Sequence, residues 1–300
     1  MPPLTLSHLD FVQWEIIILS TANNTVTADT RGSTAYNYSY NKRNRLAELA
    51  IASTVTADYT YDGLERLAIR TTSNMTPAGT THYLYDRTGH LLVEADDTGQ
   101  TLREYVWLDD MPLAVVSDVN TMSPNLYFVH ADHLDTPVRM TDGSKAVVWD
   151  AYFLAFGTVA SITGSASNNL RFPGQYFLIE DGLHYNWYRH YDPTIGRYLQ
   201  PDPLGLEALL SDGPSVYAYV SLNPANYTDP TGQLKLTKRQ IEAIFRACMF
   251  AWRLLTGNPE IKVPGPIPPP PISRPAPRIP KLEPPKEPPG GSPPPPPPKP

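Results

Sequence analysis

A repeated pattern of aromatic residues constrains the fold of this chain more than any other sequence feature. Four consecutive segments follow one template, in which two aromatic residues flank a single position and are followed by a turn and an apolar run. The aligned aromatic residues are Tyr40, Tyr61, Tyr85 and Tyr105. Because their spacings of 21, 24 and 20 residues are typical of periodic repeat architectures, the sequence predicts a repeat protein.

Each repeat has the sequence pattern of a β-hairpin. Alternating aromatic residues are typical of a strand with one buried face, and the apolar run after the turn supplies the partner strand. Asp62 and Gly63 predict a two-residue type I′ turn, whereas the longer turn of the next repeat contains Gly89, which can adopt positive φ. Because a lone hairpin is marginally stable in water, we expect the hairpins to pair side by side.

The carboxyl-terminal part of the chain differs in composition from the repeats. A capping box over residues 237–240 and apolar residues at helical spacing predict one amphipathic helix over residues 234–258. Of the 34 prolines, 21 lie in residues 259–300, so we expect a disordered tail there that favours extended polyproline II conformations. An adaptor role for this tail is one hypothesis for its function.

The charge is distributed unevenly along the chain. Residues 234–300 hold eleven Lys and Arg against four Glu, which leaves about −13 of charge on residues 1–233 when the total is −6. This acidic body argues against nucleic-acid binding by the main domain. The sequence contains no apolar run long enough for a transmembrane helix and no classical signal peptide, and the single Cys248 excludes an intramolecular disulfide.

Five further motifs follow the repeats in order: HADHLDTPVRMTD, WDAYFLAFG, LRFPGQY, GLHYNWYRHYDPTIGRYLQPDPLGL and NPANYTDPTG. With the repeats, they make residues 36–232 similar to the Rhs repeat-associated core domain, a relative of the YD-shells of teneurins and toxin-complex C proteins. The resemblance implies a mainly β fold, in which a spiral of YD-repeat hairpins forms part of a hollow shell and a core domain caps one end. We therefore expect a C-terminal fragment of a bacterial polymorphic toxin.

The resemblance also implies how the chain is divided. We expect an irregular segment over residues 1–35, YD repeats over 36–118, the core or cap domain over 119–233, the helix over 234–258 and the tail over 259–300. In the family the core domain cuts the chain after the last DPxG motif, which releases a C-terminal cargo. The implied partners are the chain's own C-terminal segment, upstream shell repeats, a secretion-system component and an immunity protein. The implied location is the bacterial cytoplasm before export.

Two DPxG motifs supply the candidate catalytic residues. Asp202 and Asp229 align with the catalytic aspartates of the family, and Arg189 aligns with its arginine. If folding brings the carboxylates together, repulsion raises one pKa so that the pair shares a proton, as in an aspartic protease. The expected cleavage lies between Gln233 and Leu234, although the family has an apolar residue where this chain has Gln233, and a shorter segment between the aspartates.

Other interpretations of these motifs remain open. Asp-Pro-x-Gly is a good turn in any protein, so a non-catalytic YD-repeat scaffold for surface adhesion or carbohydrate binding is the alternative to self-cleavage. His130, Asp132 and His133 lie close together in the sequence, but a role in a turn or in packing is favoured over metal binding. We expect neither a metal ion nor a cofactor.

Overall fold

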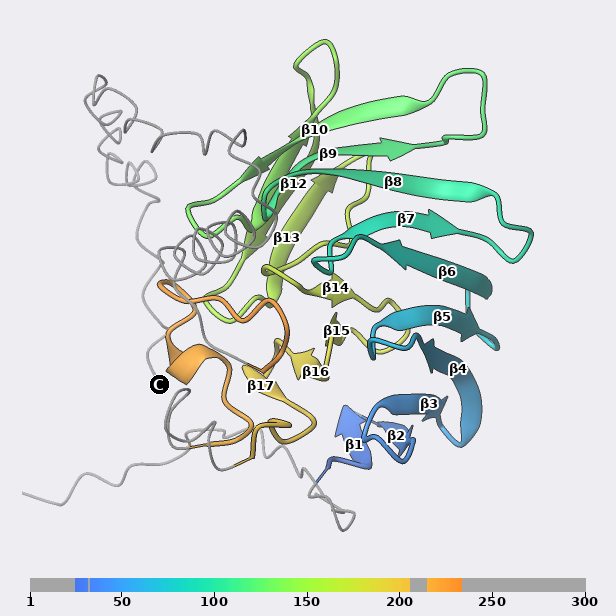
Figure 1. Ribbon diagram of the computed structural model, residues 1–300, viewed down its shortest axis with the longest axis vertical. Helices are drawn as coiled ribbons and strands as arrows, with labels where there is room; N and C mark the ends of the chain where they lie inside the picture. The colour runs from blue at the N-terminus through green and yellow to red at the C-terminus, as the bar shows by residue number, and fades with distance from the viewer. Residues whose placement is uncertain (1–24, 32, 206–214, 234–300) are drawn as a thin grey trace, which may run out of the picture. The chain divides into compact units, whose positions relative to one another are not determined.

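The computed structural model describes residues 25–31, 33–205 and 215–233 (Figure 1). Nearly all regular structure in these residues is β-strand, which confirms the predicted mainly β fold; the predicted helix and tail lie outside the described residues. The strands are β1 (Ala28–Arg31), β2 (Thr34–Tyr40), β3 (Leu46–Ile51), β4 (Thr54–Tyr61), β5 (Leu67–Thr72), β6 (Gly79–Tyr85), β7 (Leu91–Ala95), β8 (Thr101–Leu108), β9 (Met111–Ser117), β10 (Asn125–Ala131), β11 (Pro137–Thr141), β12 (Val147–Phe153), β13 (Val159–Gly164), β14 (Tyr176–Phe177), β15 (His184–Asn186), β16 (Arg189–Asp192) and β17 (Arg197–Tyr198). A 3-10 turn, η1 (Val220–Leu222), follows.

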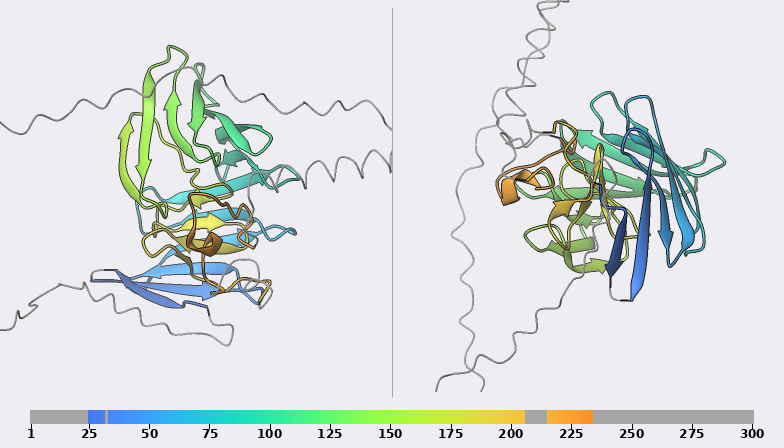
Figure 2. Two further views of the ribbon diagram at one scale, coloured as in Figure 1. Left: turned by 90° about the vertical axis from the view of Figure 1, so that its left-hand side faces the viewer. Right: turned by 90° about the horizontal axis from the view of Figure 1, so that it is seen from below.

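The first thirteen strands form one sheet in which every strand pairs antiparallel with the strands before and after it in the sequence. This is the side-by-side pairing of hairpins that the repeats predict. In each of the four repeats the pairing register shifts by one residue just before the second aromatic residue. Such β-bulges bend a strand and increase its twist, and the sheet is strongly curved (Figure 2).

The two aromatic residues of each repeat have different roles. The first, at Tyr38, Tyr59, Tyr83 and Tyr105, is buried in the core. The second donates a hydrogen bond to a backbone carbonyl of the preceding strand or segment, at Tyr40 to Val26, Tyr61 to Leu46, Tyr85 to Leu67 and Trp107 to Leu91. The structural equivalent of Tyr40 in the fourth repeat is therefore Trp107 and not Tyr105, which corrects the last repeat spacing to 22 residues.

The turn after β4 differs from the predicted type I′ turn. The loop is longer than two residues, because the Asp62 backbone N–H donates to the carbonyl of Arg66 at 2.8 Å. Positive φ falls on Glu65, at 66°, and not on Asp62 or Gly63. The Asp62 side chain accounts for the difference, since its Oδ1 accepts hydrogen bonds from the N–H groups of Leu64 and Arg66 and so stabilises the longer loop.

The last four strands, β14 to β17, form a small antiparallel sheet that packs against the curved sheet (Figures 1 and 2). Both sheets contribute to one hydrophobic core, in which Tyr83 and Tyr176 meet edge to face with ring centroids 5.3 Å apart. Leu178 and Leu183 are fully buried there. The face of the curved sheet that carries the buried tyrosines is therefore covered by side chains of the small sheet and its loops.

The amino-terminal part differs from the expectation of an irregular segment over residues 1–35. Its described residues include β1, which pairs in register with β2 from Ala28 opposite Asn37 to Arg31 opposite Thr34. The sequence of this strand, Ala-Asp-Thr-Arg, contains a single apolar residue and so shows no alternation of apolar and polar residues. Within the described ranges, no helix is long and apolar enough to cross a membrane.

Candidate functional site

The three candidate catalytic residues come together beside the small sheet. Arg189 is the first residue of β16, Asp202 follows β17, and Asp229 lies in a loop four residues before Gln233. All three are buried, with exposed fractions of 0%, 4% and 0% for Arg189, Asp202 and Asp229. Residues that are distant in the sequence thus form one polar cluster that is shielded from water.

The Arg189 guanidinium group is the centre of this cluster. Its Nη2 lies 2.9 Å from Oδ2 of Asp202 and 3.0 Å from Oδ2 of Asp229. Nη1 donates to the carbonyl of Val216 at 3.2 Å, and Nε donates to the carbonyl of Gly232. One guanidinium group therefore holds both carboxylates and the backbone just before the predicted cleavage site.

Each aspartate uses its two oxygens differently. Oδ1 of Asp202 accepts from the N–H of Leu204 at 2.8 Å, and Oδ1 of Asp229 accepts from the N–H of Gln233 at 3.0 Å. Oδ2 of each faces Arg189. The Oδ1 contacts are the same kind of turn contact that Asp62 makes, so both the turn role and the convergence of the carboxylates are present at these residues.

Two neighbouring residues complete the network, and the sequence analysis missed both. The Tyr198 hydroxyl group donates to Oδ2 of Asp229 at 2.9 Å, and the centroid of the Tyr198 ring lies 3.6 Å from Cζ of Arg189. Asn186 donates through Nδ2 to the Tyr198 hydroxyl at 2.8 Å and to the Asp229 carbonyl at 2.9 Å. Their only sequence signal was their place within the aromatic motif between Gly182 and Gly205.

The electrostatics of Asp202 are dominated by burial and by Arg189. The pKa of Asp202 is raised, chiefly by burial, with a smaller contribution from Asp229, while Arg189 opposes the shift. Because both Oδ2 atoms lie about 3 Å from the same nitrogen, the guanidinium group stands between them. The two carboxyl groups are thus joined through Arg189, and burial raises the pKa of Asp202.

The loop at the predicted cleavage site is held tightly up to Gln233. Gly232 has a φ of +73°, and a Cβ atom there would lie 2.5 Å from the carbonyl oxygen of Asn186. Glycine is therefore required at this position both for the backbone conformation and for the close approach of β15. Leu234, the other residue of the predicted cleavage site, lies outside the described residues.

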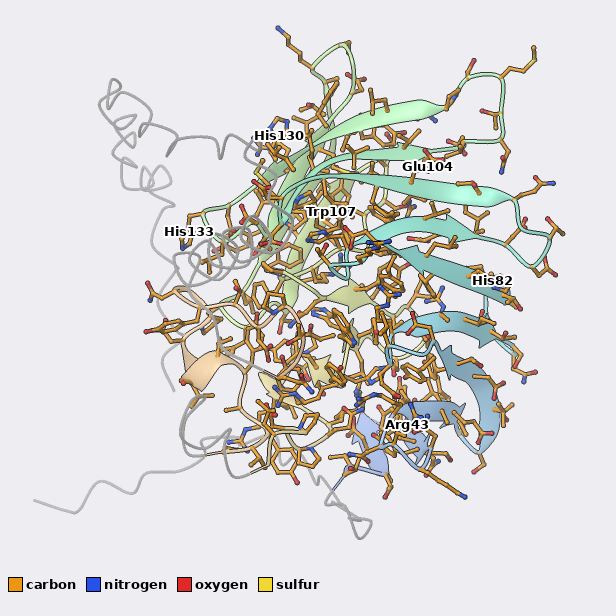
Figure 3. All side chains as sticks on the ribbon, viewed as in Figure 1. Arg43, His82, Glu104, Trp107, His130 and His133 are labelled. Atoms are coloured by element: carbon orange, nitrogen blue, oxygen red, sulfur yellow. The ribbon has the colours of Figure 1, made fainter. Side chains whose placement is uncertain are left out.

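The histidines at His130 and His133 do not converge with Asp132. His130 lies on β10 and bonds to the Thr141 hydroxyl group at 2.9 Å, whereas His133 lies in the following turn and bonds to the Ala225 carbonyl at 2.9 Å (Figure 3). Oδ1 of Asp132 accepts from backbone N–H groups of its own turn. Among residues 25–31, 33–205 and 215–233, no group of three His, Cys, Asp or Glu residues could hold a metal ion.

The chain is similar to a known protein family and to known toxins. The teneurin YD-shell family model matches residues 5–219. The double-stranded DNA deaminase toxin A of Burkholderia cenocepacia is 27% identical over 242 residues, which are 65% of this chain and 17% of that protein. The toxin protein Tse5 of Pseudomonas aeruginosa is 41% identical over 105 residues, which are 35% of this chain and 8% of that protein.

Among solved structures, the Tc holotoxin pore of Photorhabdus luminescens contains a chain with a similar fold. It matches with a TM-score of 0.57 at 19% identity, over 73% of this chain and 11% of that chain. The matched part of this chain therefore spans less than a fifth of the length of each of these relatives.

Proposed function

This chain belongs to the teneurin YD-shell family, and we propose that it forms part of a toxin-enclosing β-shell and cuts itself between Gln233 and Leu234. The resemblance to Rhs-type YD-shell proteins of bacterial polymorphic toxins is confirmed by its relatives. The observation that carries the proposed cleavage is the buried Arg189 group, which contacts Asp202, Asp229 and the Gly232 carbonyl together.

The shell role is supported by the curved sheet and by the relatives. Thirteen strands form a continuous antiparallel wall, and the relatives are named as toxins. The cargo we propose is the chain's own segment after Gln233. Upstream shell repeats, a secretion-system component and an immunity protein are the further partners that this function requires.

The proposed cleavage assigns different roles to the two aspartates. Asp202, whose pKa is raised by burial, carries a proton and donates a hydrogen bond to the Gln233 carbonyl. Asp229 accepts a proton from a water molecule, whose oxygen adds to the Gln233 carbonyl carbon. That proton then passes to the Leu234 nitrogen as the carbon–nitrogen bond breaks, which leaves a carboxyl group on Gln233 and an amine on Leu234.

The neighbours of Asp229 hold its side chain next to Gln233. Arg189, Tyr198 and the Gln233 N–H all donate hydrogen bonds to it. These hydrogen bonds hold both carboxyl oxygens of Asp229 in a fixed orientation. Arg189 also holds the Gly232 carbonyl, which fixes the peptide that precedes the proposed scissile bond.

The test is to express the full chain of 33.3 kDa and to follow its mass over time by denaturing gel and mass spectrometry. We expect two products, one that ends at Gln233 and one that begins at Leu234. Asp202→Asn and Asp229→Asn should each slow the cleavage by at least about 100-fold, because general acid–base catalysis typically contributes that much.

A matched control is Asp96→Asn. Asp96 caps an exposed turn through its Oδ1 in the same way but has no contact with Arg189, so this variant should be cut at the wild-type rate. A new terminus at Gln233 would instead assign the cut to the peptide bond that Arg189 and Asp229 hold. A wild-type chain that stays intact after long incubation contradicts the cleavage.

A non-catalytic scaffold is the second candidate function. The observation that favours it is that Asp202 and Asp229 cap their turns as Asp62 and Asp96 do, with the buried Arg189 as a structural ion-pair partner. In that case the full chain stays intact, and Asp229→Asn lowers the stability of the folded protein without any change in its mass.

A further inference from the structure

Two buried polar side chains of the small sheet, Tyr198 and Asn186, contact Asp229. Tyr198 lies on β17 and Asn186 lies on β15, and both are buried. Asn186 is directly opposite Arg189 in the pairing of β15 with β16. The strands of the small sheet therefore bring both side chains to the candidate site.

The two carboxyl oxygens of Asp229 have different donors. Oδ2 accepts from Nη2 of Arg189 at 3.0 Å and from the Tyr198 hydroxyl group at 2.9 Å. Oδ1 accepts from the N–H of Gln233 at 3.0 Å. Because a carboxyl oxygen has two lone pairs, these two donors occupy both acceptor positions of Oδ2. A proton that Asp229 takes up is therefore directed to Oδ1, the oxygen next to Gln233.

The Tyr198 hydroxyl group is oriented as a donor to Asp229. Nδ2 of Asn186 donates to the hydroxyl oxygen at 2.8 Å, so the single hydroxyl proton points to the carboxyl group. Burial, and after it the charge of Asp229, raises the pKa of Tyr198 well above its ordinary value. The hydroxyl group therefore keeps its proton near neutral pH.

The Asn186 amide is fixed by a second contact of the same nitrogen. Nδ2 also donates to the backbone carbonyl of Asp229 at 2.9 Å, and a carbonyl can only accept. Within the described residues, Oδ1 of this amide is buried without a hydrogen-bond partner. Because a buried acceptor without a donor lowers stability, the two contacts of Nδ2 determine how the amide is oriented.

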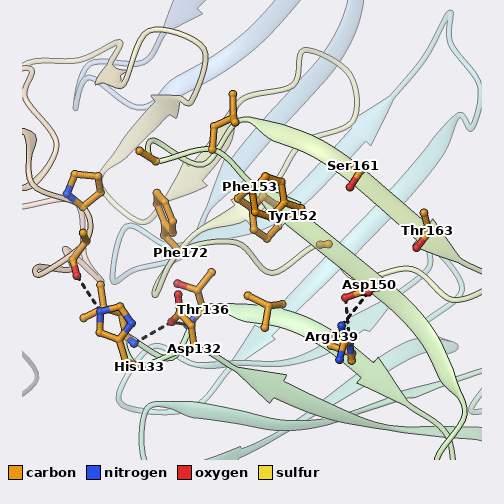
Figure 4. Close-up of a pocket in the computed structure, with 17 residues that line it drawn as sticks. Asp132, His133, Thr136, Arg139, Asp150, Tyr152, Phe153, Ser161, Thr163 and Phe172 are labelled. Atoms are coloured by element: carbon orange, nitrogen blue, oxygen red, sulfur yellow. Dashed lines mark hydrogen bonds and ion pairs between the residues drawn. The ribbon is translucent and has the colours of Figure 1, made fainter. Parts of the chain in front are cut away.

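Aromatic contacts hold the Tyr198 ring in this position. Its centroid lies 3.6 Å from Cζ of Arg189, and the ring meets Tyr191 and Tyr219 edge to face, with centroids 5.6 and 6.0 Å apart. Tyr219 stacks in turn on Phe172, which lines a cavity of about 530 Å³ beside β12 and β13 (Figure 4). Contacts on several sides leave the hydroxyl group little freedom to move.

We propose that Tyr198 and Asn186 are positioning residues for the self-cleavage and direct the proton that Asp229 accepts to its Oδ1. This inference rests on the proposed function. As the water oxygen adds to the Gln233 carbonyl carbon, the water proton binds to Oδ1 of Asp229. The same proton then passes from Oδ1 to the Leu234 nitrogen as the carbon–nitrogen bond breaks, and Tyr198 keeps its own proton throughout.

A purely structural role of these residues has a different consequence. If Tyr198 only stabilises the small sheet, loss of its hydroxyl group lowers the stability and leaves the cleavage rate unchanged. If it directs the proton, its loss lets the proton bind to Oδ2 of Asp229, from which a further transfer is needed to reach the Leu234 nitrogen. Proton transfer then limits the rate more strongly, so the cleavage becomes slower and more sensitive to the replacement of H2O by D2O.

The test is to measure the cleavage rate of the full chain and its variants in H2O and in D2O by mass spectrometry. We expect Tyr198→Phe, which keeps the ring, to be cut about 10- to 100-fold more slowly than the wild-type chain, with a larger ratio of the two rates. Asn186→Leu has a similar side-chain volume but no donor, so it should also be slower. Near-ultraviolet dichroism, which reports packed aromatic rings, checks that each variant is folded.

Tyr191→Phe is the matched control. Tyr191 is also buried in the small sheet, but its hydroxyl group donates to the carbonyl of Phe156 at 2.8 Å, so this variant should keep the wild-type rate and isotope ratio. A wild-type rate or isotope ratio in Tyr198→Phe, or equal slowing in Tyr191→Phe, would overturn the positioning role and leave the cleavage standing. If Tyr198→Phe does not fold, a wild-type rate in Asn186→Leu overturns it. A wild-type chain that stays intact contradicts the cleavage itself, and the positioning role with it.

Discussion

At the scale of single residues, Asp181 is a buried carboxyl group that lies outside the proposed cleavage site. It is 5% exposed, and its Oδ1 accepts from the N–H of Leu183 at 2.9 Å. Within the described part of the chain, its Oδ2 has no hydrogen-bond partner. Burial, together with the neighbouring Glu180, raises the pKa of Asp181 to about 8. The protonated form is therefore favoured in the folded protein near neutral pH.

This shift makes folding stability depend on pH. An aspartate in an unfolded chain has a pKa of about 4, so between that value and about 8 the folded protein binds the proton of Asp181 more tightly. The stabilisation is complete below the unfolded pKa and is lost as the pH rises through the folded pKa. Asp181→Asn removes this dependence, since the amide does not titrate and retains the acceptor for Leu183.

The variant and the wild-type chain should be compared by chemical denaturation at pH 5 and pH 8. We expect the unfolding free energy of the wild-type chain to fall by roughly 3 to 4 kcal/mol more than that of Asp181→Asn over this range. Asp142→Asn, a change in an exposed turn, serves as the control and should follow the wild-type slope. Equal slopes for wild-type and Asp181→Asn would contradict a protonated Asp181.

The residues of the candidate site were only partly predictable from the sequence. Asp202, Asp229 and Arg189 were selected through a family resemblance, because two turn motifs and one arginine carry no signal of proximity by themselves. Tyr198 lies 31 residues from Asp229 along the chain, and Asn186 lies 43 residues away. Contacts of such separation depend on how the small sheet packs, which no local pattern specifies.

At the scale of strands and turns, the repeats are connected to one another at two levels. Within the sheet, the second aromatic residue of each repeat donates a hydrogen bond to the preceding segment. At the turns, Arg66 donates to the carbonyl of Asp86 at 2.6 Å, and His90 bonds to Asp110 at 2.9 Å. Each hairpin therefore stabilises the next, as expected for an array in which neighbours supply the stability.

Tyr61→Phe tests this connection. The Tyr61 hydroxyl donates to the carbonyl of Leu46 at 2.8 Å, so its removal leaves a partly buried acceptor without that donor. We expect the unfolding free energy to fall by about 1 kcal/mol, measured by denaturant titration. Tyr152→Phe is the matched control, because that hydroxyl lies on an exposed ring, and it should change the stability by less than about 0.5 kcal/mol. If both variants lose the same stability, the hydroxyl contact between the repeats contributes nothing specific.

The strands were predictable to the extent that their pattern is periodic. Alternating aromatic residues and apolar runs predicted the hairpins of the curved sheet, because a half-buried strand imposes a period of two. The prediction of a type I′ turn at Asp62 was wrong because the Asp62 side chain, and not Gly63, determines the conformation of the loop. The alignment at Tyr105 was wrong because it matched the first aromatic residue of the fourth repeat with the second aromatic residue of the other three. The bulge before Trp107 identifies the equivalent position.

At the scale of the whole described part, the curved sheet and the small sheet share one core. Tyr59 donates to Glu180 at 2.7 Å, and the Tyr185 hydroxyl accepts from the N–H of Leu67 at 2.8 Å. Arg45 donates to the carbonyl of Tyr188 at 2.7 Å. The polar and apolar contacts between the curved sheet and the small sheet are therefore continuous. Beside this shared core, the small sheet contributes to one smaller cluster of its own, Tyr191, Tyr198, Tyr219 and Val220.

We therefore expect the curved sheet and the small sheet to unfold in one transition. Leu183→Ala creates a cavity in the shared core, since Leu183 is 0% exposed, and such a change costs about 2–5 kcal/mol. Ile179→Ala is the matched control from the same segment, because Ile179 is 52% exposed, and its effect should stay within about 0.5 kcal/mol.

Far-ultraviolet dichroism reports the strands of both sheets, and near-ultraviolet dichroism reports the packed aromatic rings. In Leu183→Ala both signals should shift to the same lower denaturant midpoint. Two separated midpoints, with only the near-ultraviolet signal shifted, would mean that the cap unfolds without the wall, and the shared core would not be a single cooperative unit.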